Sequence, residues 1–259
     1  MTLNKYNLNN IYFSNELIYY LTNESLKRKS IEIYSQLLKN KIVTISINSK
    51  NYPEKLKRLK SPPIAIYIKE EFWTSNVFNY MCIGGENIHV IAQQLTNYSN
   101  KILNNIFYNN SIKILITNLQ SGKINMDIAS QIKSKSLINN NCKIINIICG
   151  EYTELILNLN KYKFQIAIFN NYSNENIEVI ESEIVSVLSD YMILLESGYS
   201  KTILKKIDMF LENGKEIFTI PSSIFNKYAI LNNYLIKQGC NIITSKEELK
   251  LYLTNSLYK

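Results

Sequence analysis

Side chains able to do covalent or acid–base chemistry are few in this 259-residue sequence. It holds one histidine, His89, which excludes any site that needs two histidine ligands. A serine triad would also need His89, which lies at the start of a stretch with helical spacing. The four cysteines, Cys82, Cys142, Cys149 and Cys240, form no CxxC pair, so a zinc knuckle and a disulfide framework are poor fits. We therefore expect no catalytic residue, no metal and no cofactor.

Small and cationic residues follow three of the apolar segments. Backbone N–H groups at tight turns and helix starts can hold an anion, and a lysine adds charge. The phosphate-loop pattern GxxxxGK[ST] is absent, because Thr117 stands where its first glycine belongs and Ile124 follows Lys123. The predicted anion-binding residues are Gly84, Gly85, Thr117, Asn118, Gly122, Lys123, Ser197, Gly198, Lys201 and Thr202. Glu196, just before the last four, has two open interpretations: a ligand or partner contact, or a cap or ion-pair partner.

The elements that would position these residues alternate along the chain. Isoleucine-rich runs predict buried strands at 41–47, 64–68, 80–83, 113–117, 143–149, 166–169, 191–195, 216–220 and 241–244. Helical spacing predicts helices at 88–108, 124–138, 177–188, 201–211 and 227–237. This alternation indicates an α/β fold: a Rossmann-like, mostly parallel sheet with helices on both faces. Ligands bind such sheets beyond the carboxyl ends of the strands.

Residues 1–40 differ from the rest, since they predict helices at 15–21 and 24–38 and no strand. We interpret them as a short N-terminal helical extension, followed by one domain over residues 41–259. No long linker and no repeat divides that domain.

Composition narrows the class of protein. Hydrophobic residues make up 46% and charged residues 19%, which is enough for a sizeable core. Residues 1–150 hold 18 Lys and Arg against 8 Asp and Glu, whereas residues 151–259 hold 11 against 13. A basic first part suits a polyanion, although most surface lysines are only solvated. No apolar run is long enough to span a membrane, and no signal peptide is present, so we expect a cytoplasmic protein without a membrane partner.

Several segments resemble, in order, the conserved blocks of the DprA/Smf family. A Tyr-Pro-x-x-Leu start at 52–56 and a Pro-Pro segment at 61–67 come first, and the matching blocks that follow lie at 188–196, 197–202, 214–221, 233–240 and 245–249. The resemblance covers about residues 41–253. It implies a Rossmann-like protein that binds single-stranded DNA, works in DNA uptake and recombination, and is not an enzyme. It also implies a homodimer and a RecA-type recombinase as partner.

The sequence departs from the family at several sites. Glu181 and Glu183 stand where the family has two arginines, Ser222 replaces a glycine, and an arginine expected near Gly84 is absent. Two carboxylates in a DNA groove would repel phosphates, so replacing both by arginine would tighten binding if the groove is retained. Two alternatives stay open: a nucleotide-binding or nucleotide-hydrolysing protein of the LOG or lysine-decarboxylase-like type, and a scaffold that no longer binds. The LOG-type glycine loop is missing at 221–224.

Overall fold

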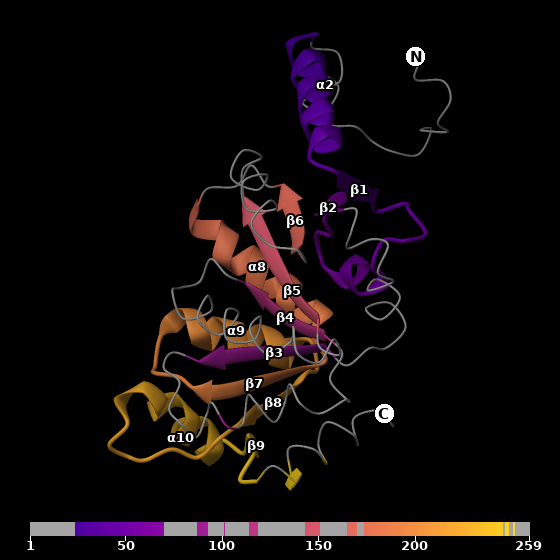
Figure 1. The fold of residues 1–259 in the computed structure, drawn as a ribbon. Helices are drawn as coiled ribbons and strands as arrows, with labels where there is room; N and C mark the ends of the chain where they lie inside the picture. The colour runs from indigo at the N-terminus through magenta and orange to yellow at the C-terminus, as the bar shows by residue number, and fades with distance from the viewer. Residues whose placement is uncertain are drawn as a thin grey trace. The chain divides into compact units, whose positions relative to one another are not determined.

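The computed structural model describes residues 24–69, 87–92, 101, 114–118, 143–150, 165–169, 174–245, 247–248 and 251. Figure 1 shows the elements in place. The strands are β1 (Ile42–Ser46), β2 (Ala65–Lys69), β3 (Asn87–Ala92), β4 (Ile114–Asn118), β5 (Lys143–Gly150), β6 (Gln165–Phe169), β7 (Tyr191–Glu196), β8 (Glu216–Thr219) and β9 (Asn241–Ile242). The helices are α2 (Glu24–Lys39), α8 (Asn174–Leu188), α9 (Lys201–Glu212) and α10 (Ile230–Lys237), with 3₁₀ turns η2 (Glu54–Arg58) and η3 (Lys227–Ala229).

The chain divides into two compact units, residues 1–42 and 43–259. In the first, α2 begins with Glu24 and ends with Lys39, so its terminal charges complement the helix dipole. The sequence-predicted helix at 24–38 is therefore present, while the one at 15–21 lies outside the described residues. The domain boundary that the sequence predicts, after residue 40, stays a prediction.

The second unit contains a mostly parallel sheet with a reversal of strand order. The order across the sheet is β1-β2-β6-β5-β4-β3-β7-β8-β9. The pairs from β6 through β5, β4, β3, β7 and β8 to β9 are all parallel, and β2 pairs antiparallel with β6. The chain thus runs outward from β3 to β6, and returns to place β7 on the other side of β3. This confirms the Rossmann-like, mostly parallel fold, and makes the β3–β7 border the topological switch point.

Most predicted elements lie where the isoleucine runs place them, but one prediction is wrong. The sequence predicts a helix at 88–108, whereas residues Asn87–Ala92 form strand β3. His89 consequently lies on a strand, while Gly84 and Gly85 lie outside the described residues. The expected strand at 80–83 lies outside the described residues, as does the expected helix at 124–138.

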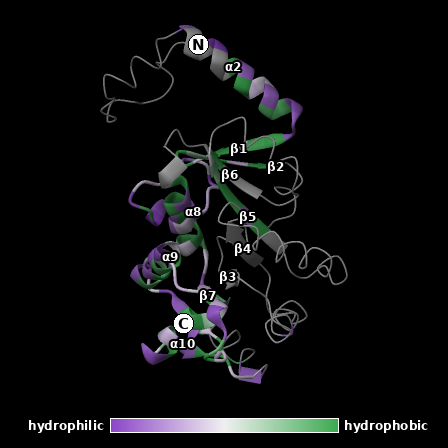
Figure 2. Cartoon of the chain, turned by 90° about the vertical axis from the view of Figure 1, so that its left-hand side faces the viewer, coloured by the Kyte–Doolittle hydropathy of each residue, from purple (hydrophilic) through white to green (hydrophobic). Residues whose placement is uncertain are grey.

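Helix α8 crosses the sheet on the return from β6 to β7. It packs against β5, β4 and β3, and α9 packs beside it and against β8. Figure 2 shows both helices on one side of the strands. The stripe that α8 buries contains Ile177, Ile184, Val185 and Leu188, spaced as one face of a helix. These side chains and those of the strands form the core beneath the switch point.

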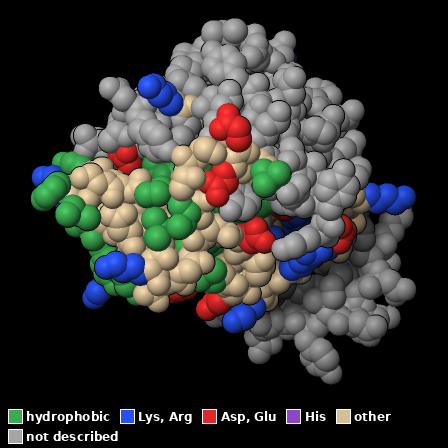
Figure 3. All heavy atoms as spheres, turned by 90° about the horizontal axis from the view of Figure 1, so that it is seen from below, with side chains coloured by type: hydrophobic (Ala, Val, Ile, Leu, Met, Phe, Trp, Pro, Cys, Tyr) green, Lys and Arg blue, Asp and Glu red, His purple; other side chains and the backbone are tan. Residues whose placement is uncertain are grey.

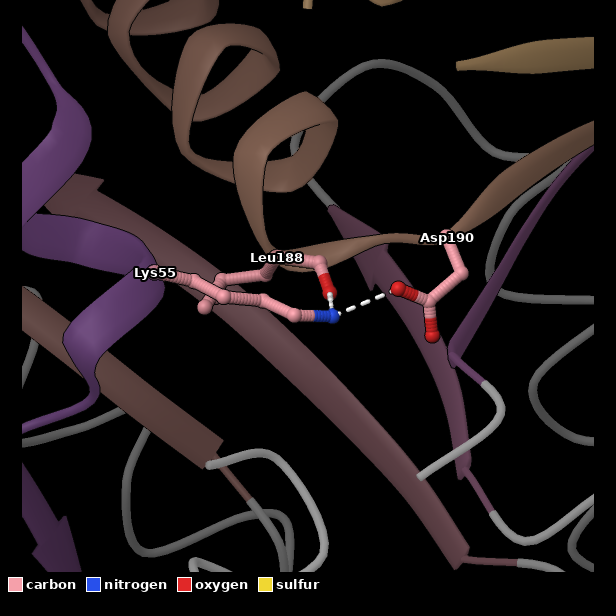
Figure 4. A network of polar contacts seen from close by, with 3 residues as sticks. All are labelled: Lys55, Leu188 and Asp190. Atoms are coloured by element: carbon pink, nitrogen blue, oxygen red, sulfur yellow. Dashed lines mark hydrogen bonds and ion pairs between the residues drawn. The ribbon is translucent and has the colours of Figure 1, made fainter. Parts of the chain in front are cut away.

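An ion pair ties η2 to the turn between α8 and β7. Lys55 Nζ donates to Asp190 Oδ1 at 2.6 Å and to the Leu188 carbonyl at 3.3 Å (Figure 4). The Tyr52 hydroxyl donates to the Pro63 carbonyl at 2.7 Å, and burial raises the pKa of Tyr52 to about 12. Through these contacts of Tyr52 and Lys55, the Tyr-Pro segment at 52–56 stabilises the fold.

Candidate nucleic-acid interface

The carboxyl ends of β3 and β7 meet at the switch point. Ala92, the last residue of β3, pairs with Glu196, the last residue of β7. Asn118 ends β4, the next strand, so Thr117 and Asn118 lie at the same edge of the sheet. A crevice at this position is where open α/β sheets bind their ligands. The structure therefore brings the predicted ends of β4 and β7 to one edge.

The loop after β7 is held by one buried asparagine of α10. Asn232 Oδ1 accepts from the Ser197 N–H at 2.9 Å. Its Nδ2 donates to the carbonyls of Leu195, Leu194 and Ile220, at 2.9, 3.1 and 3.2 Å. Asn232 is fully buried, so these bonds satisfy backbone groups at the strand ends where water does not reach. The hydrogen bonds of the Asn232 side chain thus hold the ends of β7 and β8 together.

Ser197 belongs to the same hydrogen-bond network as Asn232. It is fully buried, and its carbonyl accepts from the Leu231 N–H at 3.0 Å. Its hydroxyl donates to the Gly198 carbonyl at 3.3 Å. With its N–H engaged by Asn232, Ser197 fixes the path of the loop, and the solvent-facing groups are those that follow it.

Those following groups lie at the start of α9. Ser200 is the N-cap, and its hydroxyl accepts from the Ile203 N–H at 3.2 Å. Lys201 and Thr202 are exposed in the first turn, which holds no acidic residue. The first N–H groups of a helix have no acceptor within the helix, and the dipole favours an anion there. Ser200, rather than Glu196, caps this helix; Glu196 is buried at the end of β7.

A second asparagine holds the loop after β8. Asn233 Oδ1 accepts from the Ser222 N–H at 3.2 Å, and its Nδ2 donates to the Ser222 carbonyl at 2.9 Å. Asn226 Nδ2 donates to the Ser222 hydroxyl at 3.3 Å. Residue 222, where the sequence departs from the family glycine, is thus bound on both its backbone groups and its side chain.

Exposed apolar and aromatic side chains adjoin these two loops. We call them the apolar rim: Tyr199, Ile224, Phe225, Tyr228, Ile230 and Tyr234, with exposed fractions from 40% to 90%. Tyr199 and Tyr234 meet edge to face at 6.0 Å between ring centroids, and Lys227 lies 5.1 Å from the Tyr228 ring centroid. Figure 3 shows hydrophobic side chains gathered on this face, with lysines near them. Patches of this kind on a protein surface mark binding sites.

The predicted anion-binding residues fall into three groups. Ser197, Gly198, Lys201 and Thr202 form one loop and helix start, and Thr117 and Asn118 end β4. Gly84, Gly85, Gly122 and Lys123 lie outside the described residues. Nothing in the sequence pattern predicted Asn232 or the apolar rim, although Asn232 adjoins a block that carries the family resemblance. Their assignment as a binding site stays a prediction.

Glu181 lies in the interior, which corrects the expectation that its carboxylate faces a DNA groove. Its side chain is fully buried on the sheet-facing side of α8, and Glu183 is half-buried. Burial lowers the pKa of Lys206, on α9, to about 8, and the carboxylates of Glu181 and Glu178 oppose that shift. Burial and the Glu181 carboxylate raise the pKa of the Cys149 thiol. Glu181 thus belongs to a buried polar cluster beneath the helices.

No helix in the described part of the chain is long and apolar enough to cross a membrane. Among the same residues, no group of three or more His, Cys, Asp or Glu side chains is placed to hold a metal ion.

Comparisons with known proteins point in one direction. No protein-family model matches the chain. It is 26% identical, over 226 residues, to the DNA processing protein DprA of Bacillus subtilis, a match that covers 80% of this chain and 70% of that protein. The resemblance to the DprA/Smf family stated from the sequence is thereby confirmed.

The fold has the same neighbours among solved structures. DNA processing protein A of Streptococcus pneumoniae superposes with a TM-score of 0.60 at 17% identity, over 88% of this chain and 81% of that chain. DNA processing protein A of Helicobacter pylori, studied for its single-stranded DNA binding mode, gives 0.58 at 13% identity, over 83% and 95%. Both agree with the Rossmann-like sheet.

Proposed function

We propose that this chain is a DprA/Smf-like DNA-processing protein that binds single-stranded DNA at the carboxyl ends of β3, β7 and β8. Similarity to DprA proteins supports the class, and the geometry of the loop after β7 supports the place. The observation that carries the proposal is the junction of an exposed cationic helix start, at Lys201, with an aromatic pair, Tyr199 and Tyr234. Single-stranded DNA needs both, because lysines bind its phosphates and aromatic rings stack on its bases.

The strand would be bound without chemical change. Lys201, Thr202 and the first N–H groups of α9 would hold phosphates, and Tyr199 would stack on a base. Gly84, Gly85, Thr117, Asn118, Gly122, Lys123 and Gly198 complete the proposed site as the sequence predicts it. Within the proposal the protein is a cytoplasmic binding protein rather than an enzyme, and needs no cofactor.

Two protein partners belong to the same proposal. A homodimer is supported by two residues of the apolar rim outside the aromatic pair: Ile224 and Phe225 are 82% and 90% exposed, and a second copy would remove them from water. A RecA-type recombinase is the partner implied by the resemblance, since bound single strands are the substrate on which such a protein assembles. Sedimentation of wild type against Phe225→Lys tests the dimer: the proposal expects a dimer only in the wild type.

The binding site is tested by titrating a labelled oligothymidine at several salt concentrations. Lys201→Glu removes a phosphate contact, so affinity falls and the log–log salt slope shrinks by about 0.7. Lys237→Glu is the matched control, since Lys237 is also exposed but lies in the last turn of α10. Equal effects of the two variants would remove Lys201 from the site.

The same preparation distinguishes the alternatives. A LOG-type protein would hydrolyse a nucleoside monophosphate, and a scaffold would bind neither nucleotide nor DNA. Strand binding without nucleotide hydrolysis supports the proposal; hydrolysis, or no binding even at low salt, overturns it.

A further inference from the structure

A cavity of about 140 Å³ opens between α8 and α9, and it shares Thr202 with the proposed DNA site. Its lining includes Glu178 and Ser182 of α8 and Thr202, Lys205 and Lys206 of α9. Glu178, Thr202 and Lys205 are exposed, so the cavity opens to solvent at their level. The volume suits a small molecule of a few heavy atoms rather than a nucleotide.

Lys206 is the unusual residue in this lining. Its side chain is only 5% exposed, in the apolar stripe of α9 that also contains Ile207 and Phe210. Burial lowers its pKa to about 8. Near neutral pH, Lys206 is therefore present as the neutral amine, the form that acts as a nucleophile, more often than an unperturbed lysine is.

From this cavity and its buried amine we propose that Lys206 is a modification site for small acyl donors, of the class of acyl phosphates. The Nζ lone pair attacks the acyl carbon, so that an N–C bond forms and the C–O bond to phosphate breaks. The bonding electrons leave with the phosphate, and the proton lost from nitrogen passes to solvent through the adjacent Glu178 carboxylate. The products are an amide and inorganic phosphate, with no oxidation or reduction.

The other lining groups explain the choice of donor. The Lys205 ammonium and the Thr202 hydroxyl lie in the same lining and favour an anionic leaving group over a neutral one. Lys206 lies four residues after Thr202 on α9. Acylation removes the positive charge of Lys206 beside the buried Glu181 carboxylate of α8. The modification would therefore loosen the packing of the helix that carries the proposed phosphate contacts.

The test incubates the full chain with acetyl phosphate from pH 6.5 to 9.5 and follows each lysine by peptide mass spectrometry. Lys205 is the matched control, because it is the adjacent residue and lies on the surface. We expect Lys206 to be acetylated at least tenfold faster than Lys205 at pH 7.5, with a rate that is half-maximal near pH 8 and levels off above it. A Lys206 rate no higher than that of Lys205 would overturn the proposal.

Two surface variants sharpen this result without disturbing the core. Glu178→Gln removes a charge that holds the pKa of Lys206 up, so the rate should level off at a lower pH. Lys205→Gln should slow acetylation of Lys206 by acetyl phosphate but not by an uncharged acetylating ester. An unmoved pH profile, or equal slowing with both donors, contradicts the assigned roles. Neither outcome depends on DNA binding.

Discussion

The Glu181 carboxylate on α8 accepts a hydrogen bond from the backbone N–H of Cys149 in β5, with 2.9 Å between Oε1 and N. A ladder N–H that faces a helix carboxylate is not available to ligands, and the carboxylate is not available to solvent. Glu181 therefore joins the central helix to the sheet, and lies outside any surface that a DNA strand could follow.

This contact reverses the expectation for arginine at position 181. Glu181→Arg places a cation beside buried Lys206 and leaves the Cys149 N–H without its acceptor. We expect the free energy of unfolding to fall by about 3–5 kcal/mol, the range for leaving a buried charge uncompensated. Urea titration at pH 7.5 measures it.

Glu183→Arg is the control, because Glu183 is half-buried on the same helix and should change stability by less than about 1 kcal/mol. Tighter DNA binding by a fully stable Glu181→Arg variant would contradict the burial of Glu181.

The helical spacing of apolar residues around Glu181 indicates this burial, although the composition of the chain does not. Ile177, Ile180, Glu181, Ile184 and Val185 follow the spacing of one helix face, so Glu181 falls inside the apolar stripe. Lys206 falls in the stripe of α9 in the same way. A charge within such a stripe predicts a buried polar contact, but its partner, Cys149, is 32 residues away and only the fold supplies it.

Strand β3 could not be predicted from the local sequence pattern. Residues 88–92 contain Ile88, Val90 and Ile91, which suit a strand, yet longer helical spacing across 88–108 favoured a helix. The segment forms a strand because it pairs with β4 on one edge and with β7 on the other. A central strand satisfies its backbone groups on both sides. Such pairing is non-local and cannot be found from a short run.

Asn232→Ala should open the ends of β7 and β8. The change removes an acceptor and a donor from buried backbone groups, so we expect a loss of about 3 kcal/mol in the free energy of unfolding. Asn233→Ala is the comparison: Asn233 is half-buried and, among the described residues, its side chain bonds Ser222, so a loss of about 1 kcal/mol is expected. Equal losses in the free energy of unfolding of the two variants, measured by chemical denaturation, would show that the hydrogen bonds of Asn232 stabilise the fold no more than those of Asn233.

The Lys55–Asp190 pair should contribute little by itself. Its side chains are 16% and 28% exposed, so solvent weakens the attraction. A double-mutant cycle with Lys55→Met and Asp190→Asn should give a coupling energy of about 1 kcal/mol. A value near zero would mean that the Leu188 carbonyl alone holds the Lys55 ammonium.

Lys206 should make stability rise with pH. Its pKa is about 8 in the folded chain and 10.5 when unperturbed, so between these values the unfolded chain binds more protons. The free energy of unfolding then increases with pH across this window, by about 3 kcal/mol in total. Below pH 8 the cost of burying the charge is fully present.

The contribution of Lys206 is isolated by the difference between wild type and Lys206→Met, in urea titrations at pH 8, 9 and 10.5. Both proteins share the thiols of Cys149 and Cys240 and the Tyr52 hydroxyl, so these titrations cancel in the difference. A difference that stays constant with pH would show that the Lys206 ammonium is not buried.

Tyr199→Ala should weaken binding of single-stranded DNA by about five- to 150-fold, the range for loss of one base–aromatic stack. Tyr199→Phe keeps the ring and its edge-to-face contact with Tyr234, so its affinity should stay near wild type. Tyr34→Ala is the matched control, because Tyr34 on α2 is likewise 61% exposed but belongs to the first compact unit. Fluorescence anisotropy with a labelled oligothymidine at low salt compares the three. If Tyr199→Ala and Tyr34→Ala bind equally well, the bases do not stack at the start of α9, and the DNA path must be sought at another edge of the sheet.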